Sequence, residues 1–524
     1  GEPQDDDARY QTSYYDGYRV MLSTAIRFRW LVLPTAVAFL VFGGWLFQFV
    51  GKTFFPASER TQLQVIVELP VGANTSSTVG AIERITEWLL RDAENPEVDD
   101  VVSYVASGGP RFYLALAPPD GYANNAYMIV NVKRTQDVVT VRERLNRWAL
   151  RAIPEARVTP KEMSMGPSEA GLVEFRLIGP SSGVLAEASE KLMAALRAAP
   201  DTTGIKSDWE NPTVALQVIV DQNAARRAGI SSQDIATALN TQLAGDKITD
   251  FRVEDVAIPV VLRAQGDQRT NIDRVRTLNV GVVGDAAVPL LQVAQFDGKV
   301  SYARIKRRDL RRVMTVSGKS TTLTAQELDA EVANTLEQII SNLPAGYAIE
   351  KGGEIESSSE AQGNLFASLP LALALMVLVL IWQFDSFKKP VIILLTIPLV
   401  LTGVSAGLLV FPGANFSFMG ILGFLALAGI VVNNAIVLLD RIDIELAAGR
   451  AAFEAVIEAG VRRLRPIVMT TCTTALGLAP IILSRDVLFY DLAVVIAGGL
   501  VVGTVLTLVV APCLYATFYR VKSN

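Results

Sequence analysis

Hydrophobic residues along the chain form long unbroken runs near both ends, with a long mixed segment between them. Six runs have the length that an α-helix needs to cross a hydrocarbon core, which is about 20 residues for a core of about 30 Å. These runs cover residues 30–50, 365–384, 390–411, 416–439, 466–483 and 487–519. The pattern predicts a membrane protein with one span near the start of the chain and five near its end.

The mixed segment, residues 51–364, repeats one pattern of strand followed by helix. TQLQVIVELP, LVEFRLIGP, VALQVIVDQ and VMTVSGKS alternate apolar and polar positions, and a run with helical periodicity follows each of them. Such units predict an α+β fold of split β-α-β layers, with helices covering one sheet face. A strand-rich patch at about 245–305 interrupts the last unit and is interpreted as an inserted subdomain. One large α/β domain is the alternative interpretation.

Basic residues lie mostly in the loops on one side of the predicted membrane. Arginines precede the first span and fill the loop after the fourth, Lys388 and Lys389 follow the second, and the opposite short loops offer only Arg485. The positive-inside rule therefore predicts that both termini are cytoplasmic. The mixed segment then lies outside the inner membrane, in the periplasm of a bacterium.

Two cytoplasmic stretches, residues 13–30 and 451–466, combine apolar and basic residues at helical spacing. We expect them to form helices at the membrane surface. Soluble connecting helices are the alternative.

Composition excludes several classes of function. The 524 residues carry a net charge of −5, which argues against nucleic acid as a partner. Histidine is absent, and the only cysteines, Cys472 and Cys513, lie in the last two spans. A histidine base or ligand is therefore excluded, and the segment between the spans has no thiolate metal site. We expect neither enzyme activity nor a cofactor. The chain begins at Gly1 without a signal peptide, and we interpret it as a segment of a longer protein.

The fourth span contains two adjacent amides, Asn433 and Asn434, in the run GILGFLALAGIVVNNAIVLLD. A polar side chain in lipid needs a partner, so the pair is expected to face protein, water or an ion path. No Asp or Glu lies in the middle of a span, because Asp385, Asp440 and Asp491 lie at the ends. If the protein moves protons, the carboxylates must come from a different segment.

Four stretches together identify a family: FFPASERTQLQVIVELPVGAN, WQFDSFKKPVIILLTIPL, GIVVNNAIVLLD and RRLRPIVMTTCTTALGLAPI. In their order and spacing the chain resembles the C-terminal half of a resistance–nodulation–division (RND) efflux transporter of the hydrophobe/amphiphile exporter type. The resemblance implies six membrane helices, two porter subdomains and one docking subdomain.

The expected domain boundaries follow from that resemblance and from the patterns above. We expect a cytoplasmic amphipathic segment, a first span, a first porter subdomain, a second porter subdomain divided by a docking subdomain, five further spans and a cytoplasmic tail. These correspond to residues 1–29, 30–50, 51–170, 171–222 with 306–364, 223–305, 365–519 and 520–524.

The resemblance also implies a function. It predicts proton-driven export of amphiphilic drugs from the inner membrane or periplasm, by a homotrimer that works with a periplasmic adaptor and an outer-membrane channel. The N-terminal half of the same pump is then a partner. Alternatives are a separately expressed half that is inactive alone, a membrane protein that uses the porter folds for envelope binding, and a heavy-metal exporter for copper or silver.

The resemblance assigns a proton relay to four positions. Asn433 occupies the place where many relatives have a lysine, Asn434 is the usual asparagine, and Arg463 and Thr470 match relay positions on the fifth span. An amide cannot carry the alternating charge of a lysine, so it can only form hydrogen bonds to a carboxylate or water. The alternatives are a polar clamp between packed helices and threonine hydroxyls that bond their own helix.

The expected substrate loop is VVSYVASGGPRFYLALAPPDGYANNAYMIVNV. Tyr104 and Ile129 match drug-pocket positions of the family, and Phe112 and Tyr127 are aromatic residues close to them; Tyr104 and Tyr127 as plain core residues are the alternative. The Gly-Gly-Pro element lies outside the strands, so alanine substitutions there are expected to leave the fold intact.

A metal site is a further hypothesis for Met163 and Met165, because thioethers are soft ligands that suit Cu(I). A third ligand is not evident from the sequence, so no metal site is assigned.

Overall fold

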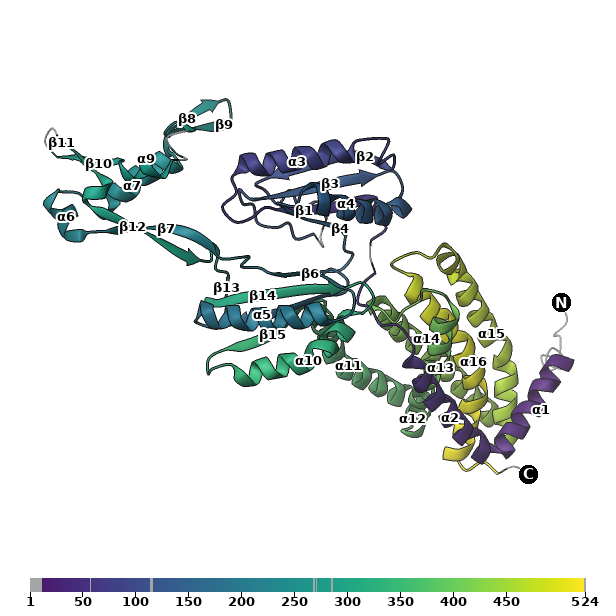
Figure 1. The fold of residues 1–524 in the computed structure, drawn as a ribbon. Coiled ribbons are helices and arrows are strands. Elements are labelled where there is room, and N and C mark those ends of the chain that lie inside the picture. Colours follow the sequence, from purple (N-terminus) through teal and green to yellow (C-terminus); the bar gives the residue numbers. More distant parts are fainter. Residues whose placement is uncertain are drawn as a thin grey trace. The chain divides into compact units, whose positions relative to one another are not determined.

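A computed structural model describes residues 12–56, 58–113, 116–266, 269, 271–283 and 286–522 (Figure 1). The chain forms two compact units. The first consists of Gly1–Asp208 and Lys306–Asn524, and the second consists of Trp209–Ile305.

Six long apolar helices of the first unit form the membrane part. The third begins as α12 (Lys388–Thr396) and continues through the 3-10 turn η4 (Ile397–Leu399) into α13 (Val400–Val410). The others are α2 (Arg29–Phe47), α11 (Glu354–Phe384), α14 (Phe418–Ala447), α15 (Ala452–Ser484) and α16 (Tyr490–Phe518). All six are long and apolar enough to cross a membrane. The predicted arrangement of one span and then five is confirmed.

Helix α15 differs from the sequence prediction at its start. Instead of a surface helix at 451–466 and a separate span, one helix runs from Ala452 through Pro466 to Ser484. Its first turns are buried at Val456, Ala459 and Val461, so packing stabilises the helix beyond the membrane. At 33 residues it is about 50 Å long, well above the thickness of a hydrocarbon core.

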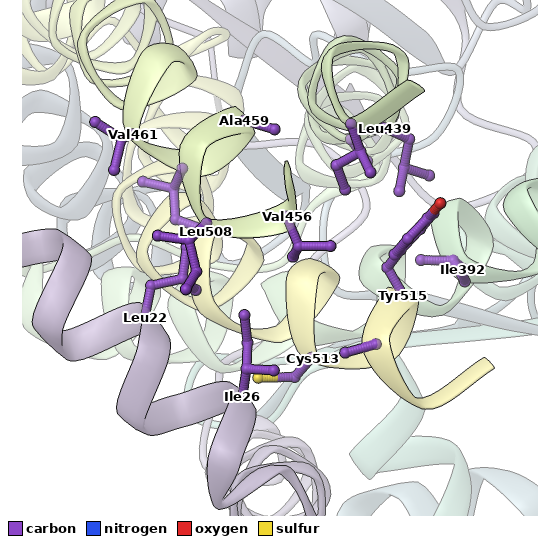
Figure 2. Close-up of a cluster of buried hydrophobic side chains, with 14 of the residues drawn as sticks. Leu22, Ile26, Ile392, Leu439, Val456, Ala459, Val461, Leu508, Cys513 and Tyr515 are labelled. Carbon is purple, nitrogen blue, oxygen red and sulfur yellow. The ribbon is translucent and has the colours of Figure 1, made fainter. Parts of the chain in front are cut away.

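Helix α1 (Ser13–Arg27) packs against α15 and α16. Figure 2 shows Leu22 and Ile26 of α1 among buried side chains of these helices. A Cβ at Gly460 of α15 would lie 2.7 Å from a methyl carbon of Leu22, so glycine permits the close approach. The Tyr18 hydroxyl donates a hydrogen bond to the Leu508 carbonyl of α16 at 2.9 Å.

The first sheet is a four-stranded antiparallel sheet with the order β2-β3-β1-β4. Its elements follow the chain order β-α-β-β-α-β, and apolar positions of β1 alternate into a core shared with the two helices. The Asn74 side chain caps α3 by accepting a hydrogen bond from the Ser77 N–H. The elements are β1 (Gln62–Glu68), α3 (Thr75–Leu89), β2 (Val98–Val105), β3 (Asn125–Val132), the turn η2 (Thr135–Asp137), α4 (Val138–Ala152) and β4 (Arg157–Glu162).

The second sheet repeats this topology with one large change. Its strands pair as β6-β14-β5-β15, and the short β13 also pairs with β14. The connection between β6 and β14 contains the whole second unit, where the first sheet has only a loop. The elements are β5 (Leu172–Ile178), α5 (Ser182–Ala198), β6 (Thr202–Ser207), β13 (Arg307–Arg308), β14 (Arg311–Ser320), α10 (Ala325–Asn342) and β15 (Ala348–Gly353).

The second unit contains three two-stranded sheets, in which β7 pairs with β12, β8 with β9 and β10 with β11. Because β7 pairs with β12, the unit already begins at Trp209, and the expected boundary at residue 223 falls inside it. The elements are β7 (Thr213–Val220), α6 (Gln222–Arg227), α7 (Ser232–Leu243), β8 (Asp246–Val253), β9 (Val256–Leu262), α9 (Ile272–Arg276), β10 (Asn279–Val283), β11 (Ala286–Pro289), η3 (Leu290–Gln292) and β12 (Ala294–Ser301).

Candidate functional site

The two amides of α14 lie in different surroundings. Asn434 is 7% exposed and packs inside the helix bundle, whereas Asn433 is exposed on the surface of α14. Within the part of the chain that the structure describes, neither side-chain amide forms a hydrogen bond with another residue. An exposed amide on a membrane helix therefore needs a partner outside this chain.

Threonine hydroxyls of α15 donate to carbonyls of their own helix, and one of them, Thr471, donates to Ile467 at 2.9 Å and also contacts α16. Thr470 is exposed and donates to the carbonyls of its own helix at Ile467 (2.8 Å) and Pro466 (3.1 Å). Thr471 is buried, and its hydroxyl lies 2.8 Å from the hydroxyl of Thr504 on α16. Arg463 lies two turns before Thr470, and its buried Nε has no hydrogen-bond partner among the described residues.

From the threonines of this span, which include Thr471, sequence reasoning chose Thr470 for the relay, and it did not name Thr504. The signal was present, because the buried residues Leu464, Ile467 and Thr471 follow one another at spacings of three and four on one helix face. That spacing places Thr471, rather than Thr470, on the packed side. The only carboxylate buried in α16 within the described residues is Asp491, at the start of the helix, where it accepts the Asn415 N–H at 2.9 Å.

The four residues expected to contact substrate lie around the β2–β3 connection, but not as one surface. Tyr127 is fully buried and Ile129 is 9% exposed, so both belong to the core beneath the loop together with Met163. Tyr104 lies next to them, with its ring 6.5 Å from that of Tyr127. Burial raises the pKa of the Tyr127 phenol to about 12. Phe112 is different, because it lies in the loop and is 41% exposed.

Two glycines, Gly108 and Gly109, allow the backbone of this loop to approach Pro119 and the Tyr127 ring closely. A Cβ at Gly108 would lie 1.8 Å from the Pro119 carbonyl oxygen, and one at Gly109 would lie 2.9 Å from the Tyr127 ring. Gly109 also has a φ of +73°, which L side chains rarely adopt. An alanine at either position must therefore displace the loop, and survival of the rest of the fold stays a prediction.

A cleft of about 820 Å³ opens beside this loop. Its wall combines two arginines with aromatic rings and thioethers, and none of the described residues that line it is acidic. The guanidinium of Arg60 lies 4.9 Å from the centre of the Tyr113 ring, and the Tyr113 hydroxyl lies 3.6 Å from the Met163 sulfur. The lining residues are Phe55, Ser58, Arg60, Arg111, Tyr113, Leu116, Ala117, Pro118, Ser164, Met165, Pro167, Met419 and Leu488.

The family follows from a comparison with known proteins. The model of the AcrB/AcrD/AcrF family matches residues 8–519. The chain belongs to the AcrB/AcrD/AcrF family. This family consists of RND transporters, so the resemblance drawn from the sequence is confirmed at the level of the family, and the chain belongs to a class of transporters, not enzymes. It is a multi-pass inner-membrane protein with a large extramembrane segment.

Relatives within this family are named for resistance to metals. The nickel and cobalt resistance protein CnrA of Cupriavidus metallidurans is 27% identical over 522 residues, which cover 95% of this chain and 47% of CnrA. The nickel-cobalt-cadmium resistance protein NccA of Alcaligenes xylosoxydans xylosoxydans is 27% identical over 524 residues, which cover 96% of this chain and 48% of NccA. This AcrB/AcrD/AcrF chain thus spans about half the length of the curated relatives it matches.

Solved structures agree in fold. Two crystal forms of a heavy metal efflux pump superimpose on this AcrB/AcrD/AcrF chain with TM-scores of 0.75 and 0.74, at 25% identity. Each comparison covers 96% of this chain and 52% of the pump chain.

Proposed function

We propose that this chain is one half of a proton-driven exporter whose substrates are heavy-metal cations. The observation that carries the proposal is the similarity along nearly the whole chain to two proteins that are named for resistance to nickel, cobalt and cadmium. The complementary half supplies the rest of the transporter. A homotrimer, a periplasmic adaptor and an outer-membrane channel complete the assembly that we propose.

At the cleft, the side chains that suit a soft metal cation are the thioethers of methionines. Met165 and Met419 line the cleft, and Met163 lies directly behind Tyr113. Among the described residues, no group of three His, Cys, Asp or Glu side chains could hold a metal ion. Thioethers select soft cations such as Cu(I), so we expect soft cations to bind this chain better than nickel or cobalt.

Proton coupling is assigned to the face that contains Asn433. We propose that Asn433, Asn434, Arg463 and Thr470 form the relay together with a carboxylate from the complementary half. Exposure of Asn433 and Thr470 on neighbouring helices supports this proposal, because both remain accessible to a partner helix.

A second candidate substrate is an amphiphilic molecule with an acidic group. The cleft favours it, because Arg60 and Arg111 line it together with apolar and aromatic side chains. A bare dication is repelled by two guanidinium groups, whereas an acidic group is attracted and an apolar body fits the walls. The positive charge of the cleft therefore opposes binding of a metal cation and favours binding of an acidic amphiphile.

The test is a resistance assay with the full-length transporter that contains this chain, expressed in a host without its own exporters. Tolerance to Cu(I), Ag(I), Cd(II), Ni(II) and Co(II) is measured beside tolerance to a panel of anionic and neutral amphiphiles. Met163→Leu and Met165→Leu should lower metal tolerance, while Met21→Leu, an exposed methionine of α1, should not. Tolerance to amphiphiles alone, lowered by Arg60→Ala, would reject metal export and support the second candidate.

A further inference from the structure

Three covalent connections join the membrane helices and the two sheets of the first unit. The chain leaves α2 through residues 48–61 to the first sheet, passes to the second sheet through residues 163–171, and enters α11 at Glu354 directly after β15. The Glu354 carboxylate contacts all three. It accepts the Phe54 N–H at 3.0 Å and the Gly171 N–H in a short hydrogen bond, and it belongs to α11 itself.

This carboxylate is buried, because Glu354 is only 3% exposed. Both of its oxygens accept backbone N–H groups, and its hydrogen bonds are therefore charge-assisted when it is ionised. Removing the carboxylate would leave two buried N–H groups without an acceptor, which costs more than the hydrogen bonds contribute. The fixed geometry at Gly353 restricts the residue further, because its φ is +67° and a Cβ there would lie 2.6 Å from the Leu172 carbonyl oxygen.

Helix α14, which contains Asn433 and Asn434, also contacts Phe54, one of the two residues that the Glu354 carboxylate binds. The Phe418 N–H, at the start of α14, donates to the Phe54 carbonyl at 3.1 Å, and the rings of Phe54 and Phe418 lie 5.7 Å apart. Phe54 thus bonds α14 through its carbonyl and α11 through its N–H. α11 continues as one helix of 31 residues from Glu354 into the membrane, with a length of about 46 Å.

We propose that Glu354 is a positioning residue that transmits displacements of α14 and α11 to the two sheets during each transport cycle. The proposal rests on the proposed export function and is independent of the substrate. Rigid elements meet at one buried carboxylate, so a shift of either helix must move Phe54 and Gly171 together. Without the carboxylate, α11 is no longer bonded to Phe54 and Gly171, so displacements of α14 and α11 do not reach both sheets together and proton movement no longer drives substrate export.

The test measures motion without reference to a substrate. In the full-length transporter with Cys472 and Cys513 replaced, Glu83→Cys on α3 and Glu190→Cys on α5 are labelled with a fluorescence donor and acceptor; both positions are exposed. Energy transfer is recorded in proteoliposomes before and after a proton gradient is imposed. We expect a gradient-dependent change in the wild type that falls roughly tenfold in Glu354→Ala and less in Glu354→Gln, which keeps one acceptor oxygen. The exposed Glu360→Gln is the control and should behave as the wild type.

An unchanged response in Glu354→Ala and Glu354→Gln would overturn the proposal, and so would a wild type that shows no response to the gradient. Failure of both variants to fold would also overturn it, because Glu354 would then be a folding residue. A resistance assay on the same variants separates this result from the export proposal. If the wild type confers no resistance while the labels still respond to the gradient, export of the tested substrates fails and the role of Glu354 stands.

Discussion

The membrane helices expose two faces that differ in chemistry. The apolar face, on α2 and α11, carries large side chains, including Trp30, Phe42, Trp45, Leu375, Leu378 and Trp382. The small-residue face, on α14 and α15, carries Ala426, Gly429, Asn433, Thr470, Thr473 and Gly477. Both faces are exposed in this chain, so exposure alone does not tell which of them contacts lipid.

The difference in side-chain size and polarity between the two faces is our basis for proposing where a protein partner binds. Large apolar and aromatic side chains suit contact with lipid, whereas small and polar residues are typical of helix–helix contacts in membranes. The chain spans about half the length of its relatives, so we assign the small-residue face to the complementary half. α15 marks the border, because it also exposes Met469, Leu476 and Leu483.

The largest effect is expected from Asn434→Leu. Leucine suits a packed apolar helix, but its side chain offers the proposed relay no hydrogen-bond donor or acceptor at this buried position. Resistance should fall to the level of the empty host, while the assembled transporter remains intact in detergent. The matched control is Leu380→Met, a buried residue of α11. Dissociation of the assembly by Asn434→Leu would instead make this asparagine a structural clamp.

A large effect on assembly is expected from Gly429→Leu and Gly477→Leu. A Cβ at either glycine meets no atom of this chain within 4 Å, so any clash must come from a partner. Overpacking of a formed interface costs about 1–3 kcal/mol per site. Gly44→Leu on α2 is the control, because it also meets nothing within 4 Å but belongs to the apolar face. Co-purification of the two halves in detergent measures the effect, and equal yields for all three variants would remove the distinction between the faces.

A smaller effect on stability is expected from Thr471→Val. The substitution removes the hydroxyl contact between Thr471 and Thr504, and such contacts contribute about 0.6 kcal/mol on average in a folded membrane protein. Thr473→Val is the control, because the exposed Thr473 hydroxyl bonds only the Met469 carbonyl of its own helix. Unfolding in detergent should separate the two variants, and the interhelical role fails if both unfold alike.

The smallest effect is expected from Asn433→Lys. Asn433 is exposed on the small-residue face, so a longer side chain does not clash within this chain. A lysine can pair with the proposed carboxylate, and resistance should remain within about twofold of the wild type, a change of less than 0.5 kcal/mol in a linked equilibrium. Complete loss of resistance would show that the relay requires an uncharged side chain here.

The sequence predicted the parts of the fold that depend on periodicity. Hydropathy placed six spans, and strand–helix units placed both sheets, because these patterns act over neighbouring residues. The boundary at Pro466 was missed, since a proline inside a helix is tolerated where side chains of the flanking turns are packed. Likewise, the identical strand order of the two sheets depends on long-range pairing that no local pattern reveals.

The candidate sites were predicted less completely. The asparagine pair was found because polar residues are rare in apolar spans, whereas the carboxylate that we propose as its partner lies outside this chain. The cleft brings Arg60, Tyr113 and Met419 together from segments far apart in sequence. Tyr127 was considered both as a substrate contact and as a core residue, and the structure places it in the core. β3 is buried at nearly every position, so its sequence does not alternate and cannot tell which face the loop covers.

Coupled flux in proteoliposomes tests whether proton coupling depends on the asparagine pair, in which Asn433 lies on the small-residue face and Asn434 is buried next to it. Proton movement and substrate uptake are measured together for the wild type, Asn434→Leu and Gly44→Leu. We expect the wild type and Gly44→Leu to move substrate with a fixed number of protons, and Asn434→Leu to bind substrate but to move neither protons nor substrate in response to the gradient. Transport by Asn434→Leu with the wild-type ratio of protons to substrate would show that the asparagine pair is not needed for proton coupling.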